Sequence, residues 1–230
     1  MRSLSLSSFL VITLCVIPAA RADTLDQSNI TLTGGELQVE VNEADLYVAQ
    51  TFTAGITGDL TRIQLDLVSQ PIHGQIGEIS PFSINVRILS VSNGAPTTNV
   101  LSSVVLAPGN YLLGTFIDFS QPAFVTAGGQ YAIAVNYIGA PSIGPGSGQG
   151  HLRGNLGDAY SGGAPCGSVD GLSWSCADPT GGDIFFQTYV ESTAVPEPAV
   201  ILLLCAGAAL VLLTRFVAVS CRLTENVKTD

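Results

Sequence analysis

Two aromatic side chains are candidate contacts for a sugar. Trp174 is the only tryptophan and lies in the cysteine-bracketed stretch CGSVDGLSWSC, while Tyr160 lies upstream in DAYSGG. A flat aromatic ring on a braced loop can stack on the apolar face of a sugar, and nearby polar groups can bind its hydroxyls. The alternative is that Trp174 covers one end of a hydrophobic core, where large aromatic side chains are common.

Four aspartates in the same part of the chain form a candidate calcium site: Asp158, Asp170, Asp178 and Asp183. Calcium prefers oxygen ligands of this kind, but the DxDxDG spacing of a dedicated calcium loop is missing. Solvated turn aspartates are therefore the favoured interpretation. The sequence predicts no cofactor, with calcium as the one candidate.

Cys166 and Cys176 are the two cysteines of the central part of the chain, because Cys15, Cys205 and Cys221 lie near its ends. Two cysteines in an oxidising compartment most economically form one disulfide. A metal site would need a different spacing and nearby histidines. We therefore expect a Cys166–Cys176 disulfide, with two free thiols as the alternative.

Residues with catalytic chemistry do not form a recognisable arrangement. GLSWS, which begins at Gly171, starts like a nucleophile elbow but lacks the final glycine. His73 and His151 both lie beside glycines, and a triad with Asp158 or Asp170 and a serine follows no known spacing. The sequence thus predicts no catalytic residues and a protein that is not an enzyme, with a secreted hydrolase as a distant alternative.

The N-terminus has the pattern of a secretory signal peptide. Met1 and Arg2 supply a positive start, the run FLVITLCVI follows from Phe9, and small residues at positions 20 and 22 suit signal peptidase. A spanning helix needs about 20 apolar residues, which this run does not reach. We expect residues 1–22 to be the signal peptide and residues 23–194 to be one extracellular domain.

The expected domain is strongly acidic. Residues 23–194 contain fifteen Asp and Glu side chains, three arginines (Arg62, Arg87 and Arg153) and no lysine. Such a surface repels phosphate backbones. The sequence therefore predicts no nucleic-acid partner.

The central segments alternate apolar and polar residues with the period of a β-strand. In LTRIQLDLV the residues Ile63, Leu65 and Leu67 point one way and Arg62 the other, and FSINVRIL and QYAIAVNYI repeat this pattern. Further candidate strands are LYVAQTFT, VLSSVVL, YLLGTFIDF and DIFFQTYV, separated by turns such as Ser92-Asn93-Gly94, whereas Gly139–Gly182 is expected to be an irregular loop or a pair of loops around a short strand. The pattern predicts an all-β protein with an antiparallel β-sandwich, jelly-roll-like or immunoglobulin-like, whose strand order stays open.

The segment between residues 47 and 190 resembles the jelly-roll-like, carbohydrate-binding-module-like domains of many bacterial secreted and surface proteins. The patterns that carry the resemblance are QTFTAGITGDLTRIQLDL, VRILSVSNGAPTTNVLSSVVL, FIDFSQPAFVTAGGQYAIAV, DAYSGG and DIFFQTYV. These are patterns of alternation and turns. The resemblance implies a fold and extracellular display, and it assigns no site residues.

The C-terminus carries a more specific pattern in VPEPAVILLLCAGAALVLLTR, which starts at Val195. Pro196, Glu197 and Pro198, then an apolar run and Arg215, resemble the PEP-CTERM sorting signal of Gram-negative bacteria that make exopolysaccharide. The resemblance implies export and transient retention by one transmembrane helix, with exosortase processing near the motif. It places the sorting signal at 195–222 and a cytoplasmic tail at 223–230. A single-pass anchor with no sorting role is the alternative, because a signal peptide and one late helix suffice for it.

Together these features predict an exported protein of the cell surface or biofilm matrix of a Gram-negative bacterium. Its expected partners are signal peptidase and exosortase during processing, the membrane through the C-terminal helix, and exopolysaccharide. The favoured role is glycan binding or adhesion, or a structural part of the envelope. The rival is a structural surface protein with no specific ligand.

Overall fold

The computed structural model describes residues 23–32, 35–40, 46–68, 83–109, 113–138, 151–157, 160–176, 182–192 and 207. All the strands belong to one compact unit, Ala22–Thr193. The predicted signal peptide and the residues of the sorting motif, Pro196, Glu197, Pro198 and Arg215, lie outside the described residues. No helix within the described ranges is long and apolar enough to cross a membrane.

The described part of the chain is built from β-strands. They are β1 (Asp23–Asn29), β2 (Glu36–Glu40), β3 (Tyr47–Thr53), β4 (Gly58–Leu65), β5 (Leu67–Val68), β6 (Ser83–Ser92), β7 (Ala95–Leu106), β8 (Thr115–Val125), β9 (Gln130–Ile138), β10 (His151–Asn155), β11 (Pro165–Ser168) and β12 (Phe186–Ser192). The predicted all-β class is confirmed. The Gly-rich segment Gly139–Gly182, expected to be mostly irregular, contains β10 and β11.

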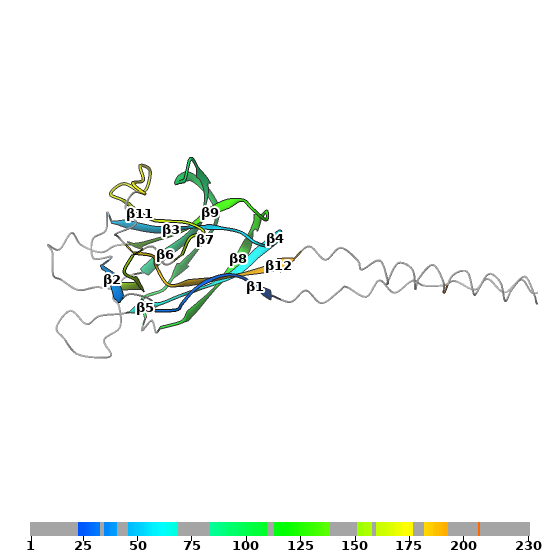
Figure 1. Ribbon diagram of the computed structural model, residues 1–230, viewed down its shortest axis with the longest axis horizontal. Coiled ribbons are helices and arrows are strands. Elements are labelled where there is room, and N and C mark those ends of the chain that lie inside the picture. The colour runs from blue at the N-terminus through cyan, green and yellow to red at the C-terminus, as the bar shows by residue number, and fades with distance from the viewer. Residues whose placement is uncertain are drawn as a thin grey trace, which may run out of the picture. The chain divides into compact units, whose positions relative to one another are not determined.

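Two larger antiparallel sheets form the sandwich, with the orders β1-β12-β4-β8 and β11-β3-β9-β6-β7. Figure 1 shows β3 and β11 in the upper layer and β1 and β12 in the lower one. When β11 is set aside, the two large sheets contain eight strands, which can be renumbered 1 to 8 in chain order. Their spatial order is then 1-8-3-6 in one sheet and 2-7-4-5 in the other. This is the double Greek key of a jelly roll.

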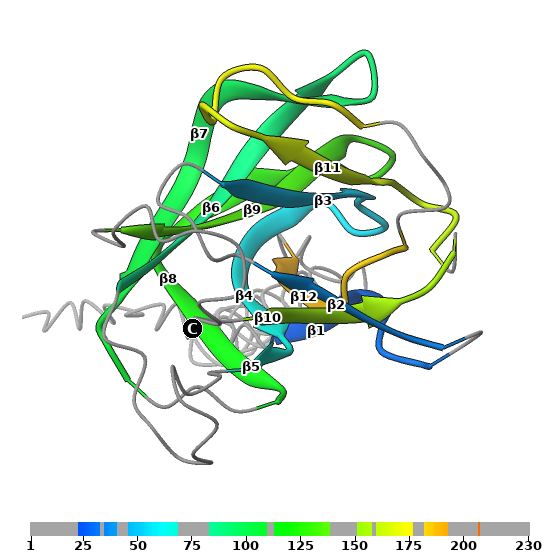
Figure 2. The same cartoon turned by 90° about the vertical axis from the view of Figure 1, so that its left-hand side faces the viewer.

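A small third sheet, β2-β10-β5, lies at the end of the domain that faces the viewer in Figure 2. Its middle strand β10 also bonds to the segment before β12: the Asn155 amide donates to the Asp183 carbonyl at 2.8 Å, and the Phe185 amide donates to the Arg153 carbonyl at 2.8 Å. The small sheet is therefore joined to the four-stranded sheet through the backbone.

Alternation along the strands places the apolar side chains between the two large sheets. Phe52, Leu60, Ile63, Val86 and Phe186 are examples from four strands, and each is at most 1% exposed. Full burial of such a side chain contributes about 1.5–3 kcal/mol. The core thus fixes which side of each strand faces outward.

The β6–β7 hairpin shows how local sequence sets the register. Asn93 and Gly94 have φ angles of 52° and 79°, the left-handed conformation that a two-residue turn needs and that Asn-Gly tolerates well. The strands then pair from Ser92 with Ala95 to Ile84 with Leu106. The predicted turn at Ser92-Asn93-Gly94 is confirmed.

Candidate functional site

The predicted disulfide is present and braces a loop beside the five-stranded sheet. Cys166 on β11 is bonded to Cys176. Gly167 and Ser175 exchange backbone hydrogen bonds of 3.0 and 2.9 Å inside this loop, and β11 pairs with β3. The loop is therefore tied to the sheet by one covalent bond and by the strand ladder.

Replacing both cysteines, Cys166→Ser with Cys176→Ser, is expected to lower the free energy of unfolding by about 2–3 kcal/mol. The crosslink restricts the unfolded chain over a short loop. Urea denaturation with and without reductant checks this. The wild type should lose stability on reduction and the variant should not change, whereas a wild type insensitive to reductant would contradict the expectation.

Trp174 packs on the outer face of the five-stranded sheet. Its ring joins a cluster separate from the main core, made by Ala49, Leu89, Ala132, Ala134, Cys166, Val91 and Cys176. Its centroid lies 6.5 Å from that of Tyr47 in an edge-on arrangement. Gly171 lets the loop approach, because a Cβ there would lie 2.9 Å from the Tyr47 ring. Trp174 thus neither covers an end of the core nor stands free in solvent.

Four buried polar atoms on this outer face have no hydrogen-bond partner: Arg87 Nε and Nη2, Asn136 Oδ1 and Trp174 Nε1. Within the described ranges these are the only buried side-chain nitrogens and oxygens left unpaired. An unmade hydrogen bond of a buried group costs about 1–3 kcal/mol, and more for a charged group. Burial lowers the pKa of the Arg87 guanidinium below its usual value, while the nearby Tyr47 opposes that shift.

Asp170 organises the disulfide loop by accepting hydrogen bonds within it. Its Oδ1 accepts from the Ser173 amide at 2.7 Å, the Leu172 amide at 2.8 Å and the Ser168 hydroxyl at 2.9 Å. The bond from Ser173, followed by those from Leu172 and Ser168, lowers the pKa of Asp170 to about 2. This carboxylate is therefore a loop cap.

The loop around Asp170 should respond to acid in a narrow window. A carboxyl group whose pKa is lowered on folding stabilises the folded loop above its ordinary pKa of about 4 and loses that effect as the pH falls toward 2. NMR of the Leu172 and Ser173 amides between pH 5 and 1.5 should give a midpoint near 2. Asp170→Asn should abolish this titration, and a wild-type midpoint near 4 would refute the loop-cap assignment.

Tyr160 and Asp183 belong to a buried polar network between the sheets. The Asp183 side chain is fully buried, and it accepts from Gln50 Nε2 at 2.9 Å and from the Tyr160 amide at 2.7 Å. The Tyr160 hydroxyl donates to Gln27 Oε1 at 2.8 Å, and its ring lies 5.0 Å from that of Phe186. Burial raises the pKa of the Tyr160 hydroxyl.

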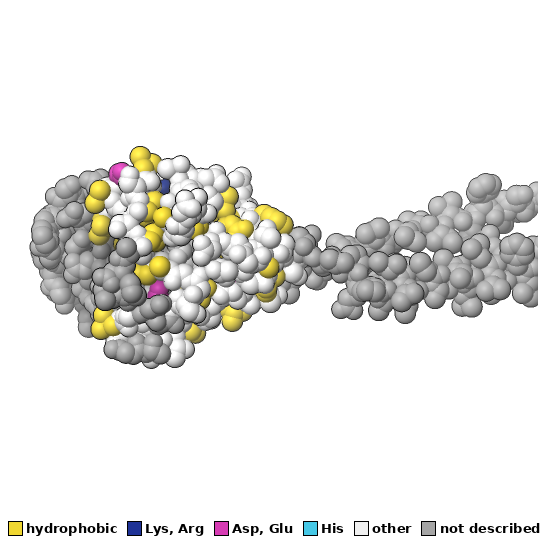
Figure 3. Space-filling view, turned by 45° about the horizontal axis from the view of Figure 1, so that its top comes forward, with side chains coloured by type: hydrophobic (Ala, Val, Ile, Leu, Met, Phe, Trp, Pro, Cys, Tyr) yellow, Lys and Arg dark blue, Asp and Glu magenta, His cyan; other side chains and the backbone are white. Residues whose placement is uncertain are grey.

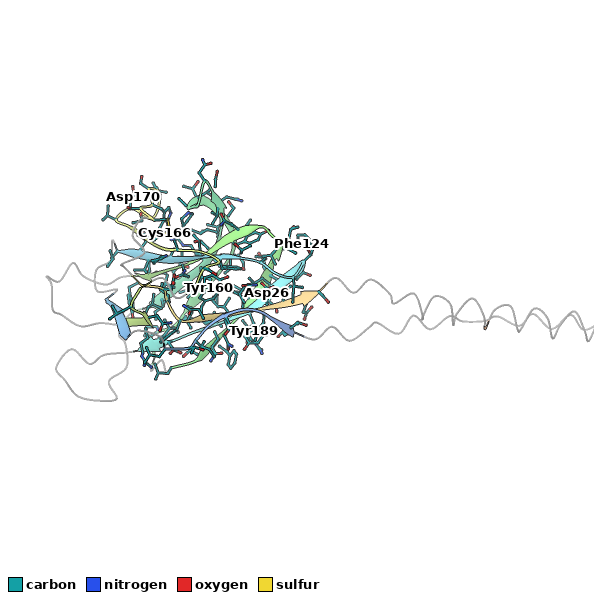
Figure 4. The ribbon with its side chains drawn as sticks, in the orientation of Figure 1. Asp26, Phe124, Tyr160, Cys166, Asp170 and Tyr189 are labelled. Carbon is teal, nitrogen blue, oxygen red and sulfur yellow. A yellow bond between two sulfur atoms is a disulfide. The ribbon has the colours of Figure 1, made fainter. Side chains whose placement is uncertain are left out.

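The predicted sugar contacts are therefore not brought together. Tyr160 packs against the core between the sheets, while Trp174 packs on the separate outer cluster. Figure 4 shows Tyr160 between the layers, with Cys166 and Asp170 beyond the upper one. A joint role of the two rings in one sugar site is not supported by this placement.

The candidate calcium ligands are only partly described. Asp158 and Asp178 lie outside the described residues, Asp170 caps its own exposed loop, and Asp183 is buried with Gln50 and Tyr160. Among the described residues, no three His, Cys, Asp or Glu side chains group closely enough to hold a metal ion. The prediction of no cofactor, with calcium as the one candidate, stays untested.

An exposed surface of a different kind covers the outer side of the four-stranded sheet. We call it the aromatic face and define it by Arg62 and Gln64 on β4, Phe116 and Asp118 on β8, and Gln187 and Tyr189 on β12. The register places them in two rows across the sheet, Gln187-Gln64-Phe116 and Tyr189-Arg62-Asp118. Phe116 is 53% exposed.

Contacts between the two rows hold the aromatic face in a defined arrangement. The Phe116 and Tyr189 ring centroids are 5.9 Å apart, and the Arg62 guanidinium lies 5.5 Å above the Phe116 ring. Arg62 Nε donates to Asp118 Oδ1 at 2.5 Å, a bond that raises the pKa of the guanidinium. The Tyr189 hydroxyl donates to Gln187 Oε1 at 3.0 Å. One exposed ring and one half-buried ring thus lie beside groups that can donate or accept hydrogen bonds.

No family model matches this chain. No curated protein matches it either. A solved structure with a similar arrangement contains the cysteine protease and lectin-like domains of Cwp84, a surface layer associated protein of Clostridium difficile. The TM-score is 0.43 at 13% sequence identity, and the match covers 70% of this chain and 37% of that chain. The chain therefore spans little more than a third of that structure.

This comparison corrects one expectation. The sequence predicts that the protein is not an enzyme, but the matched structure contains a cysteine protease together with its lectin-like domains. The missing catalytic motif was the sole basis of that prediction. The prediction is withdrawn.

The sequence contains a signal for the aromatic face that motif reasoning misses. In TFIDF, Ile117 and Phe119 are buried, so Phe116 occupies the position where a half-buried strand normally has a polar residue. Tyr189 stands likewise beside the buried Thr188 and Val190. Large aromatic residues at the solvent-facing positions of two strands could have indicated this surface.

Proposed function

We propose that the protein is an exported surface or matrix-associated protein that binds glycans through the aromatic face. The observation that carries the proposal is the pair of neighbouring rings, Phe116 and Tyr189, set among amide, carboxylate and guanidinium groups on one sheet. Aromatic rings suit the apolar faces of sugars, and fixed polar groups suit their hydroxyls.

The chemistry of the aromatic face favours a sugar over a purely apolar partner. Gln64, Gln187 and Asp118 lie within the two rows rather than around a hydrophobic centre. Protein–protein interfaces instead tend to have a core depleted in charged residues. An uncharged glycan fits best, because the carboxylates of Asp118 and Asp23 share the single cation Arg62 and the three groups together keep a net negative charge.

Export and sorting are proposed on separate grounds. The signal-peptide pattern of residues 1–22 supports secretion, and the PEP-CTERM pattern around Pro196 and Glu197 supports retention and processing at the envelope. The Cys166–Cys176 disulfide agrees with an oxidising compartment. We propose a cell surface or biofilm matrix as the place of action, with exopolysaccharide as the natural source of glycan.

A glycan array probed with the purified protein, with and without calcium, tests the proposed function. We expect binding to a subset of neutral oligosaccharides long enough to cover both rings. A dependence on calcium would support the aspartate site as well. An array without any bound glycan under both conditions would refute glycan binding and would leave the structural role that is the rival.

A further inference from the structure

We infer that the outer face of the five-stranded sheet holds a second binding site, which takes the carboxylate of an acidic sugar through Arg87. Its groups are Arg87 on β6, Asn136 on β9, Tyr47 on β3 and Trp174 on the disulfide loop. We call this set the Arg87 site. It lies on the sheet opposite the aromatic face and does not depend on the proposed function.

The strand register brings these groups together. Asn136 is directly opposite Tyr47 on one side and Asn85 on the other, and Arg87 is two residues further along β6, opposite Ala134. Ala134 and Ala49 are a cross-strand pair with small side chains, and Trp174 and the disulfide pack over them. The Arg87 guanidinium extends to 5.3 Å from the Tyr47 ring, and Trp174 contacts the same ring.

Arg87 differs from the other two arginines of the domain in having no carboxylate partner among the residues that the structure describes. Arg62 pairs with Asp118, and Arg153 pairs with Asp66. Among the described residues, Arg87 forms no ion pair, and its Nε and Nη2 make no hydrogen bond. In the described part of a domain this rich in carboxylates, a guanidinium whose buried Nε and Nη2 stay unpaired is open to the carboxylate of a ligand.

The unpaired atoms indicate which chemical groups a ligand of this site must offer. Nε and Nη2 are adjacent donors on the edge of a guanidinium, and that edge matches the two oxygens of a carboxylate. Trp174 Nε1 can donate to a further oxygen, and Asn136 Oδ1 can accept from a hydroxyl. A group that offers a carboxylate, a second oxygen and a hydroxyl beside an aromatic ring is a uronic acid.

Access to the Arg87 site depends on the disulfide loop. Trp174 lies on this loop rather than on a strand, beside Leu172 and Val169, which are 64% and 76% exposed, and a ligand reaches Arg87 only when the Trp174 side chain is displaced. The disulfide keeps the backbone of the loop close to the sheet meanwhile. On the side of the molecule that Figure 3 shows, charged side chains are few among the hydrophobic and uncharged ones. Asp170 is the one carboxylate of the disulfide loop, and its Oδ1 already accepts three hydrogen bonds within the loop.

Trp174 fluorescence gives a direct test, because this is the only tryptophan in the chain. The purified full chain in detergent is titrated with trigalacturonic acid, with its fully methyl-esterified form, and with sodium acetate. We expect a saturable change with the acid, and none with the ester at the same concentration. No change with any probe would overturn the proposal and would mean that the unpaired atoms bind only water. An equal response to acetate would overturn the assignment to a sugar acid.

Two variants and a matched control locate the binding. Arg87→Gln should weaken trigalacturonate binding at least tenfold, whereas Arg153→Gln on β10, which lies in neither proposed site, should leave it unchanged. Should Arg87→Gln fail to fold, Asn136→Asp serves instead, because it gives Arg87 a carboxylate of its own and repels the ligand. Asn136→Asp should abolish the fluorescence change and raise the thermal midpoint. Binding that survives Asn136→Asp, or that is lost in Arg153→Gln, would overturn the Arg87 site while leaving the proposed function of the aromatic face untouched.

Discussion

Replacing Phe186 with alanine is expected to lower the free energy of unfolding by about 3–5 kcal/mol. Phe186 is 1% exposed and lies between two other rings, 6.0 Å from Phe52 and 5.0 Å from Tyr160. Its removal leaves a cavity that strands from both sheets cannot close, because each is fixed by its ladder. Urea denaturation followed by circular dichroism measures the change.

Phe116→Ala is the matched control, because it removes the same side chain from the opposite face of the same sheet. Phe116 is 53% exposed, so the expected loss is within about 0.5 kcal/mol. Equal losses in the two variants would contradict the assignment of Phe186 to the inner face and Phe116 to the outer face.

The double variant Phe116→Ala, Tyr189→Ala is expected to weaken glycan binding by about 2 kcal/mol or more, roughly 30-fold in the dissociation constant. Both rings contribute to one exposed surface, with centroids 5.9 Å apart. The fold should remain, because neither side chain belongs to the core. Calorimetric titration with the tightest glycan from the array measures the loss.

Phe124→Ala provides the control for exposed aromatic area. Phe124 is 54% exposed on the same strand, β8, and it faces the same way as Phe116. The β4 residues opposite Phe116 and Phe124 are Gln64 and Asp59, which are five positions apart, about 17 Å in an extended strand. Binding should be unchanged in Phe124→Ala, and a loss equal to that of the double variant would argue against a localised site.

Strands with clear alternation are predictable from this sequence, because burial of one face leaves a period of two. Seven strands were expected on that basis, β3, β4, β6, β7, β8, β9 and β12, and all are present. The stretch LTRIQLDLV differs in one respect. β4 ends at Leu65, and Asp66 leaves the ladder, with Oδ1 accepting from the Gly114 amide and Oδ2 pairing with Arg153. The next two residues then pair with β10 in another sheet.

The strands that the sequence does not predict are those whose apolar pattern is weak. β1 reads DTLDQSN and is an edge strand held by backbone pairing with β12. β10 and β11 lie in a Gly-rich segment and pair with β2, β5 and β3, which are distant in the sequence. Pairing of this kind depends on the assembled sandwich, so local periodicity cannot reveal it.

The candidate sites were predicted less well than the fold. The Cys166–Cys176 disulfide follows from counting cysteines, but the positions of Trp174 and Tyr160 depend on which cluster each ring joins. The importance of Arg87 is visible only when Asn136 and Tyr47 are placed beside it by the register. Residue type alone marks Arg87 merely as an outward position on a strand.

The most direct test of glycan binding by the aromatic face is an NMR titration of the ¹⁵N-labelled protein with the tightest neutral glycan from the array. The largest shift changes should occur at Arg62, Gln64, Phe116 and Tyr189 on the four-stranded sheet. Changes confined to the disulfide loop around Trp174, or spread evenly over the protein, would contradict the account.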